Sequence, residues 1–118
     1  QMIDQLPEEM ATDADVVAVK AALALIDEIG ETGDPEALLA KVEANPADMQ
    51  ARYDLANAFY VAGRADMAIQ ALIDSIKQNR EWEEAKARKQ LLRIFEALGP
   101  GHALTQEGRR ALSTVLFS

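Results

Sequence analysis

The sequence contains no cysteine and few aromatic residues. Without cysteine, this segment cannot form a disulfide, a zinc–thiolate site or a thiol nucleophile. Only 5% of its 118 residues are aromatic although 49% are hydrophobic, so alanine, leucine and isoleucine must form most of the core. That composition is typical of packed helices.

Long apolar runs and targeting features are also missing. No stretch reaches the roughly 18 consecutive apolar residues that a membrane span needs. The first residues lack a basic segment followed by an apolar one, so we predict no signal peptide. We expect a soluble chain with no membrane partner, and the absence of cysteine fits a reducing cytoplasm. The sequence begins with Gln1 instead of methionine, which favours a fragment of a longer protein.

The net charge of −8 is unevenly distributed. Residues 1–48 carry 12 acidic and 2 basic side chains, a net charge of −10, whereas residues 49–118 carry 8 acidic and 10 basic side chains, a net charge of +2. A domain that binds duplex nucleic acid would carry clustered positive charge. The distribution therefore predicts a protein partner, or contact between the two halves of the chain, and no nucleic acid.

Apolar residues recur at helical spacing throughout, and no window alternates as a strand does. We expect residues 1–6 to end an upstream helix and residues 7–14 to form a polar connector. The expected helices cover residues 16–29, 36–44, 49–62, 66–79, 83–98 and 103–117. The expected N-caps are Asp13 or Asp15, Asp34, Asp48 and Asp66. The first helix is apolar at almost every position, which predicts that it is mostly buried.

One spacing occurs three times along the chain. The three sets are Leu25, Ile29 and Gly33; Leu55, Phe59 and Gly63; and Leu91, Phe95 and Gly99. Three helix pairs that each turn at a glycine predict an all-α solenoid over residues 13–118. A single pair cannot bury both of its faces, so stacking of the pairs must complete the core.

Residues 49–80 resemble a tetratricopeptide repeat. The pattern requires, in order, a large, a small, an aromatic, a turn, a small, a large and a small residue. At these positions the sequence has Leu55, Ala56, Phe59, Gly63, Ala68, Leu72 and Ser75. Pro46 stands at the closing proline of the preceding repeat. Two positions depart from the pattern, since Arg52 replaces the usual tryptophan and Arg80 the terminal proline.

Residues 34–118 also resemble a narrower group, the C-terminal domain of bacterial thioredoxin-like co-chaperones called co-chaperedoxins. The motifs that carry this resemblance are KARKQLLRIFEALGPG and RRALSTVLF. The resemblance implies an upstream thioredoxin-like domain, with residues 1–12 as its tail and linker, in the bacterial cytoplasm. It also implies a stress-response holdase that binds unfolded clients and hands them to the Hsp70 and Hsp60 systems.

The sequence offers no constellation for catalysis. His102, the one histidine, has no Asp, Cys or second His at ligand spacing, so we expect a surface or capping role. Glu81, Glu83 and Glu84 could be acid–base partners, but carboxylates in a first helical turn commonly interact with the helix dipole. No phosphate-binding loop or nucleophile motif is present. We predict no enzyme activity, no metal and no cofactor; a regulatory domain of an enzyme is an alternative.

The family resemblance also points to a binding groove. The ligand-facing positions of the repeats correspond to Gln50, Tyr53, Asn57, Tyr60, Val61, Lys86, Lys89, Arg93 and Ala97. Lys86, Lys89 and Arg93 share one helix face by their spacing alone. With Tyr53 and Tyr60 they predict a basic groove with aromatic edges for an extended acidic peptide. The alternative is a solvated face, or one neutralised by the acidic first half. The carboxylate clamp of eukaryotic repeats is not expected, because it needs lysine in place of Tyr53.

Two further features allow two interpretations each. Trp82 could be an exposed hot spot for binding, or a staple that packs on the first turns of its own helix. The last helix carries Leu112, Val115, Leu116 and Phe117 beside Arg109 and Arg110. These residues either close the core or form a docking edge, and the family resemblance favours a chaperonin contact. A generic repeat scaffold, or a module for weak homo-oligomerisation, is the alternative to the co-chaperone function.

Overall fold

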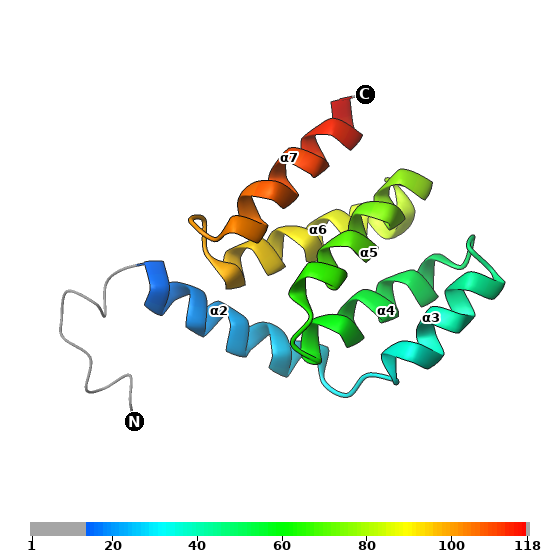
Figure 1. The fold of residues 1–118 in the computed structure, drawn as a ribbon, viewed down its shortest axis with the longest axis horizontal. Coiled ribbons are helices and arrows are strands. Elements are labelled where there is room, and N and C mark those ends of the chain that lie inside the picture. Colours follow the sequence, from blue (N-terminus) through cyan, green and yellow to red (C-terminus); the bar gives the residue numbers. More distant parts are fainter. Residues whose placement is uncertain (1–13, 118) are drawn as a thin grey trace.

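The computed structural model describes residues 14–117, which form six helices and no strand. The helices are α2 (Ala14–Ile29), α3 (Pro35–Ala44), α4 (Met49–Val61), α5 (Ala65–Gln78), α6 (Trp82–Leu98) and α7 (Ala103–Phe117) (Figure 1). The predicted all-α class is confirmed. The predicted upstream helix, the start of the connector and the Asp13 cap lie outside the described residues. Among the described helices, none is long and apolar enough to cross a membrane.

Two of the predicted N-caps are confirmed. The Asp34 carboxylate accepts a hydrogen bond from the Ala37 N–H at 3.1 Å, and the Asp48 carboxylate accepts one from the Ala51 N–H at 2.9 Å. The predicted cap at Asp66 is wrong, because α5 begins at Ala65 and its N-cap is Arg64. The cap at Asp15 is wrong as well, because this residue lies inside α2.

The turn between α4 and α5 is built around Gly63, whose φ of +83° lies in the left-handed region. The Arg64 N–H donates to the Phe59 carbonyl at 2.8 Å, which ends α4 and starts the return of the chain. The predicted turn at Gly33 is wrong. Gly30 is the left-handed residue there, with a φ of +70°, because α2 already ends at Ile29.

Helices α3 to α7 stack in the manner of a solenoid (Figure 1). Helix α4 packs between α3 and α5, α6 packs on α5, and α7 packs on both α5 and α6. The most deeply buried large side chains of this stack include Leu72, Leu91, Ile94 and Phe95. Ala68 of α5 is fully buried in this core, where a small side chain lets neighbouring helices approach closely.

Helix α2 is placed differently from the helix of a regular first repeat. It packs on α6 and makes at most weak contacts with α3 and α4. A Cβ atom at Gly99, at the end of α6, would lie 3.7 Å from the Ala18 Cβ, and Glu28 lies beside Arg93, so α2 and α6 are antiparallel. Leu25 is buried, but Val17 is 55% exposed and Leu23 is 60% exposed. The predicted burial of this helix therefore holds for one of its sides only.

The first turn of α6 is left-handed. Glu83, Glu84 and Ala85 have φ values of 48°, 58° and 64°, a region that side-chain-bearing residues seldom occupy. The carboxylates of Glu83 and Glu84 thus lie on this left-handed turn, ahead of the right-handed part of the helix. The expectation that they occupy the first turn of a regular helix is therefore wrong.

Candidate functional site

The residues predicted to line a groove lie on α4 and α6. We call this surface the α4–α6 face, and it consists of Tyr53, Asn57, Tyr60, Lys86, Lys89, Gln90 and Arg93. On α4, Asn57 and Tyr60 are buried and Tyr53 is half-buried. On α6, Lys86 is half-buried, whereas Lys89 and Arg93 are exposed. The face is therefore polar, with its α4 residues buried or half-buried and its Lys89 and Arg93 side chains exposed.

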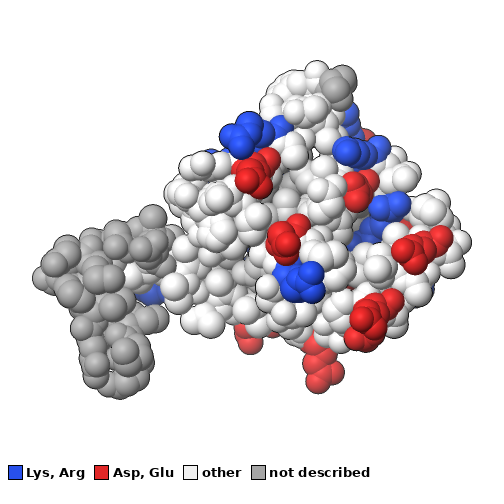
Figure 2. Space-filling model, in the orientation of Figure 1, with Lys and Arg blue, Asp and Glu red and all other residues white. Residues whose placement is uncertain are grey.

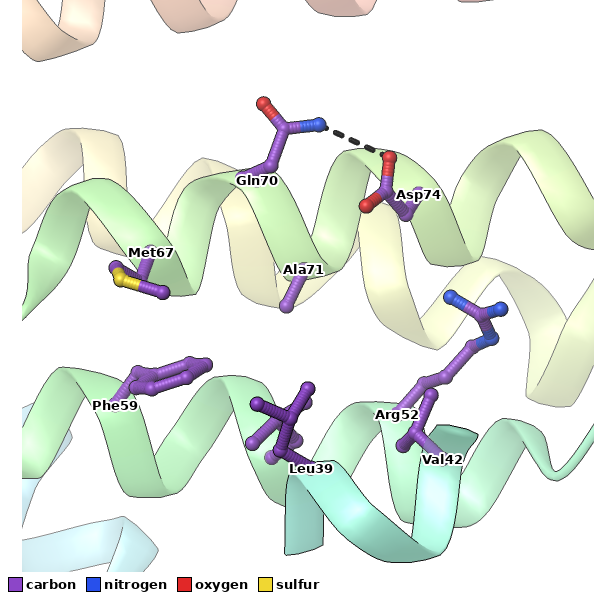
Figure 3. Close-up of a pocket in the computed structure, with 9 residues that line it drawn as sticks. Leu39, Val42, Arg52, Phe59, Met67, Gln70, Ala71 and Asp74 are labelled. Carbon is purple, nitrogen blue, oxygen red and sulfur yellow. Dashed lines mark hydrogen bonds between the residues drawn. The ribbon is translucent and has the colours of Figure 1, made fainter. Parts of the chain in front are cut away.

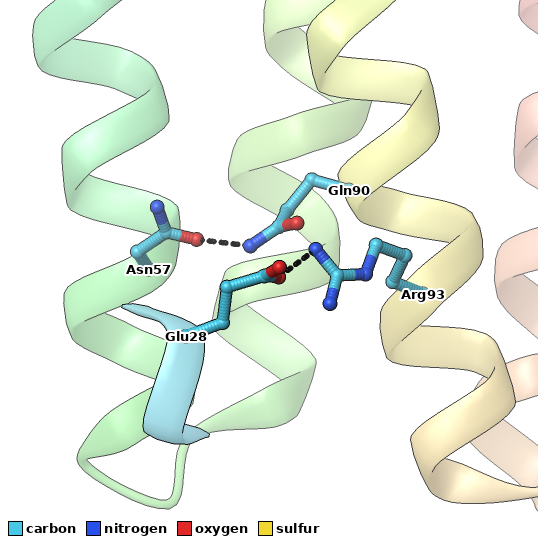
Figure 4. Close-up of polar contacts among 4 residues, drawn as sticks. All are labelled: Glu28, Asn57, Gln90 and Arg93. Atoms are coloured by element: carbon cyan, nitrogen blue, oxygen red, sulfur yellow. Dashed lines mark hydrogen bonds and ion pairs between the residues drawn. The ribbon is translucent and has the colours of Figure 1, made fainter. Parts of the chain in front are cut away.

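A buried amide pair joins the two helices of this face (Figure 4). The Gln90 amide nitrogen donates a hydrogen bond to the Asn57 side-chain oxygen at 2.7 Å. Both side chains are buried, so removing either one would leave the other without a hydrogen-bond partner and lower the stability of the folded chain. Sequence reasoning missed Gln90, although its spacing from Lys86 and Arg93 places it on the same side of α6.

An aromatic cluster lies beside the amide pair. The rings of Tyr53 and Trp82 have centroids 5.8 Å apart. The Lys86 Nζ lies 4.5 Å from the centroid of Tyr53 and 5.5 Å from that of Trp82. Trp82 thus packs against a tyrosine of another helix as well as a lysine of its own, so the staple interpretation is only partly right. The ammonium of Lys86 already has cation–π partners within the chain.

Both tyrosines of the chain lie on this face, and their environment favours the neutral phenol. Burial raises the pKa of Tyr53 above its ordinary value, while a hydrogen bond with Asn57 and the charge of Arg93 oppose that rise. Burial alone raises the pKa of Tyr60. The nearby Glu28 carboxylate adds a smaller increase in the pKa of Tyr53, which places α2 within electrostatic reach of this ring.

Helix α2 brings an acidic residue to the α4–α6 face. Glu28 forms an ion pair with Arg93, directly beside the Asn57–Gln90 hydrogen bond (Figure 4). The two side chains are 60% and 43% exposed, so water screens their attraction. A carboxylate from the acidic first half of the chain therefore neutralises part of the positive charge of Lys86, Lys89 and Arg93, which agrees with the alternative interpretation. The role of these three side chains in peptide binding stays a prediction.

The predicted docking residues of α7 fall into two groups. Leu112 is buried, and Val115 and Leu116 are half-buried against the core, so these three help to close the solenoid. Phe117 is 84% exposed, and Arg109 and Arg110 are exposed as well. The inner side of the helix thus closes the core, while its outer side presents an aromatic ring and two guanidinium groups.

Two contacts hold α7 in this position. Gly108 lies so close to α6 that a Cβ atom there would come within 2.5 Å of the Phe95 Cε1 atom. At the other end of the helix, Arg80 donates hydrogen bonds to the carbonyls of Val115 and Leu116 at 3.1 and 3.2 Å. A cation at a helix C-terminus is stabilised by the helix dipole. Sequence reasoning missed Gly108 and noted Arg80 only as a departure from the repeat pattern.

An apolar pocket opens between α3, α4 and α5 (Figure 3). Its lining consists of Leu39, Val42, Arg52, Leu55, Phe59, Met67, Gln70, Ala71 and Asp74. Arg52 stands where the repeat pattern has tryptophan, and its Nε donates to the Pro46 carbonyl at 2.7 Å. The Arg52 side chain therefore extends toward Pro46 and lines the pocket without closing it.

The titratable side chains form no catalytic arrangement in the part of the chain that the structure describes. His102 caps α7, because its Nδ1 accepts a hydrogen bond from the Leu104 N–H at 3.0 Å. This confirms the predicted capping role. Across residues 14–117 no three His, Cys, Asp or Glu side chains are grouped to hold a metal ion. On the face seen in Figure 2, basic and acidic side chains are interspersed, and no single positive patch is visible.

Comparison with known protein families gives a match to the repeat. A family model described as a tetratricopeptide repeat matches residues 28–117, which include the end of α2 and all of α3 to α7. No curated protein and no solved structure matches the chain.

Proposed function

Because this chain belongs to the tetratricopeptide repeat family, we propose that it is the protein-binding part of a co-chaperone. Repeats of this kind act as interaction modules, and their stacked helices present extended surfaces to partner proteins. In this proposal the α4–α6 face binds unfolded client proteins, and the outer side of α7 docks on the Hsp60 chaperonin. Transfer of clients to the Hsp70 system, and a location in the bacterial cytoplasm, belong to the same proposal.

The observation that carries the proposal is the surface of α7. Gly108 and Arg80 fix the inner side of the helix, yet Phe117, Arg109 and Arg110 are left exposed. Aromatic and arginine side chains are enriched among the residues that dominate binding energies. A rigid helix that presents them loses little conformational entropy on docking.

The resemblance of residues 34–118 to the co-chaperedoxins supports this choice of partners. It also supports the proposal that residues 13–118 form the repeat domain and that residues 1–12 link it to a thioredoxin-like domain. The absence of a catalytic arrangement among the described side chains fits a module that acts by binding.

Docking on the chaperonin can be tested by co-elution of the chain with purified Hsp60 in size-exclusion chromatography. We expect the wild-type chain to co-elute and Phe117→Ser to lose most of the bound fraction. Leu92→Ser is the matched control, because Leu92 is an exposed apolar residue on α6 and this change should leave binding intact. Absence of co-elution for the wild-type chain, or equal loss in both variants, would contradict docking through α7.

Client binding needs a separate measurement. We expect the chain to slow the aggregation of a heat-unfolded client, measured by light scattering. An unchanged scattering trace over a range of chain concentrations would argue against a holdase.

Self-association is a second candidate function, and one observation favours it. Helix α2 leaves Val17, Val19 and Ile26 exposed, and Figure 2 shows a largely uncharged surface in this region. Exposed apolar groups of this kind often mark protein contacts. Multi-angle light scattering would reveal a dimer that Val19→Ser disrupts; a monomer at all concentrations would exclude this candidate.

A further inference from the structure

We propose that the α4–α6 face is a helix-binding site that α2 occupies within the same chain. The external partner that the site takes is an amphipathic helix, rich in alanine and leucine, with a carboxylate that replaces Glu28. This inference rests on the proposed function, because it names the class of segment that the repeat surface binds. It adds that the surface is closed until α2 is displaced.

The packing of α2 is the first observation that leads to this inference. In a solenoid each helix pair contacts the pairs next to it. Helix α2 instead passes over its sequence neighbours α3 and α4 and packs on α6. Its last turn brings Glu28 to Arg93 and within reach of Tyr53. The last turn of α2 thus lies at the face to which the family resemblance assigns ligand binding, and the rest of the helix packs along α6.

The contact side of α2 defines the chemistry of the partner. The residues on this side are Ala18, Ala21, Ala22, Leu25 and Ile29, which recur at helical spacing. Alanine allows close approach, as at Gly99, while Leu25 fills the core between the helices. The carboxylate of Glu28 then pairs with Arg93. A helix bound in a groove is recognised by anchors at this same spacing.

Several features make α2 displaceable. Its outer side is uncovered, as the exposure of Val17 and Leu23 shows. Its ion pair with Arg93 is solvated, and such pairs contribute about 0–1 kcal/mol. It is joined to α3 through a short segment that begins at Gly30, a left-handed residue that can absorb a change of direction.

The α4–α6 face keeps its own contacts when α2 leaves. The Asn57–Gln90 hydrogen bond and the stacking of Tyr53, Trp82 and Lys86 involve no residue of α2. The span matched by the family model begins at Glu28, so most of α2 lies outside the shared repeat unit. The site is therefore preformed, and α2 acts as a competitor attached to it.

Attachment makes this competition strong. A segment on a short linker is present at an effective concentration of about millimolar. The apparent affinity for a partner in solution is then lowered, because only the small fraction of chains in which α2 is displaced can bind it. Any change that weakens α2 should therefore strengthen binding of an external helix by a similar factor.

The test uses a fluorescein-labelled synthetic peptide with the sequence of residues 14–30 as the external helix, with binding followed by fluorescence anisotropy. The wild-type chain should bind it weakly, because its own α2 fills the site. Leu25→Ser in the chain should tighten binding of the unchanged peptide by at least about 10-fold, since large-to-small changes at a buried leucine weaken packing by more than this factor.

The matched control is Leu23→Ser in the chain, which makes the same substitution on the exposed side of α2 and should leave peptide affinity at the wild-type value. A peptide carrying Leu25→Ser should lose binding, whereas a peptide carrying Leu23→Ser should keep it. Equal binding to the wild-type chain and both variants would show that the peptide uses another surface and would overturn the proposal.

A second variant covers the case in which Leu25→Ser does not fold. Glu28→Lys changes an exposed residue and should tighten peptide binding by a smaller factor of about 3, as expected for loss of an exposed ion pair. Folded variants that bind no more peptide than wild type would refute a displaceable α2. This outcome is independent of chaperonin co-elution, so failure of the inference and failure of the proposed function can be told apart.

Discussion

The α4–α5 pair and the α2–α3 segment begin from similar sequence patterns and end in different arrangements. In the first, three residues around left-handed Gly63 reverse the chain, and the two helices pack along each other. In the second, five residues separate the helices, and α2 packs on α6 instead of α3. Turn length and the distribution of apolar residues decide between the two outcomes.

Helix α5 has one apolar side, so only one orientation buries it well. Its buried positions include Ile69, Leu72, Ile73 and Ile76, and its polar residues lie on the opposite side. Helix α2 is apolar nearly all round, and each of its sides could serve as a contact. The orientation of such a helix is decided by long-range packing, and α6 is the helix on which α2 packs.

The largest expected effect tests whether α2 is a separable layer. Leu72→Ala in α5 should lower the free energy of unfolding by about 3 kcal/mol, because the surrounding stack cannot close the cavity. Leu25→Ala in α2 should cost about 2 kcal/mol or less, since the loss cannot exceed the free energy with which α2 docks.

Urea unfolding followed by circular dichroism measures both losses, and hydrogen exchange locates them. In the Leu25→Ala variant, amides of α2 should lose protection while those of α5 keep it. A uniform loss of protection across all helices would show that α2 is an integral part of the core.

The next effect concerns the polar centre of the α4–α6 face. Asn57→Ala should lower the free energy of unfolding by about 1–3 kcal/mol, because it leaves the buried Gln90 amide without its partner. Gln50→Ala is the matched control, since Gln50 bonds to Asp54 at an exposed site and its loss should cost a few tenths of a kcal/mol at most. Chemical unfolding curves of the two variants measure both losses. Similar losses of stability in Asn57→Ala and Gln50→Ala would contradict a buried hydrogen bond between Asn57 and Gln90.

Glycine substitutions sharpen the comparison of the two turns. Gly63→Ala and Gly30→Ala should each lower the free energy of unfolding by about 1–2 kcal/mol, because both residues have left-handed backbones. Gly33→Ala should be nearly neutral, since an added Cβ would make an ordinary contact of 3.4 Å with Leu38. Thermal unfolding of the three variants provides the measurement. If Gly33→Ala were the costly change, the first turn would lie where the sequence repeat placed it.

The smallest effect is a change in the pKa of Tyr53. Glu28 raises this pKa, so Glu28→Gln should lower it slightly toward the ordinary value. Absorbance of the phenolate follows the titration, and the chain has only two tyrosines, both on this face. Adding Tyr60→Phe to both the wild-type chain and the Glu28→Gln variant leaves Tyr53 as the only tyrosine that titrates. An unchanged pKa of Tyr53 would show that Glu28 lies away from its ring.

The same shifts give a pH dependence of stability. Because folding raises the pKa of both tyrosines, their contribution is fully present below the ordinary tyrosine value of about 10. It is lost as the pH rises through the higher value of the folded chain.

Local physics explains what the sequence predicted correctly. The caps at Asp34 and Asp48, the turn at Gly63 and the bounds of the helices depend on a few adjacent residues, and their side-chain and backbone preferences are visible in the sequence. The family model matches residues 28–117, a span that contains the repeat pattern of residues 49–80.

Long-range packing explains what the sequence did not predict. Nothing near Leu25 indicates that α6 is its partner, and nothing near Gly108 indicates that Phe95 fills the space beside it. The predicted groove residues were placed on two helices correctly, but the position of Glu28 over them depends on the path of α2. These features arise from contacts between distant segments, which a single sequence does not encode locally.

The central claim is that α2 lies antiparallel against α6, so that its last turn reaches the α4–α6 face. The most direct test is a nuclear Overhauser measurement on the chain with a labelled Ala18 methyl group. A strong cross-peak between this methyl group and the Gly99 α-protons is expected, because a Cβ at Gly99 would lie 3.7 Å from the Ala18 Cβ. Cross-peaks from Ala18 to α3, with none to Gly99, would contradict the claim and restore a regular α2–α3 pair.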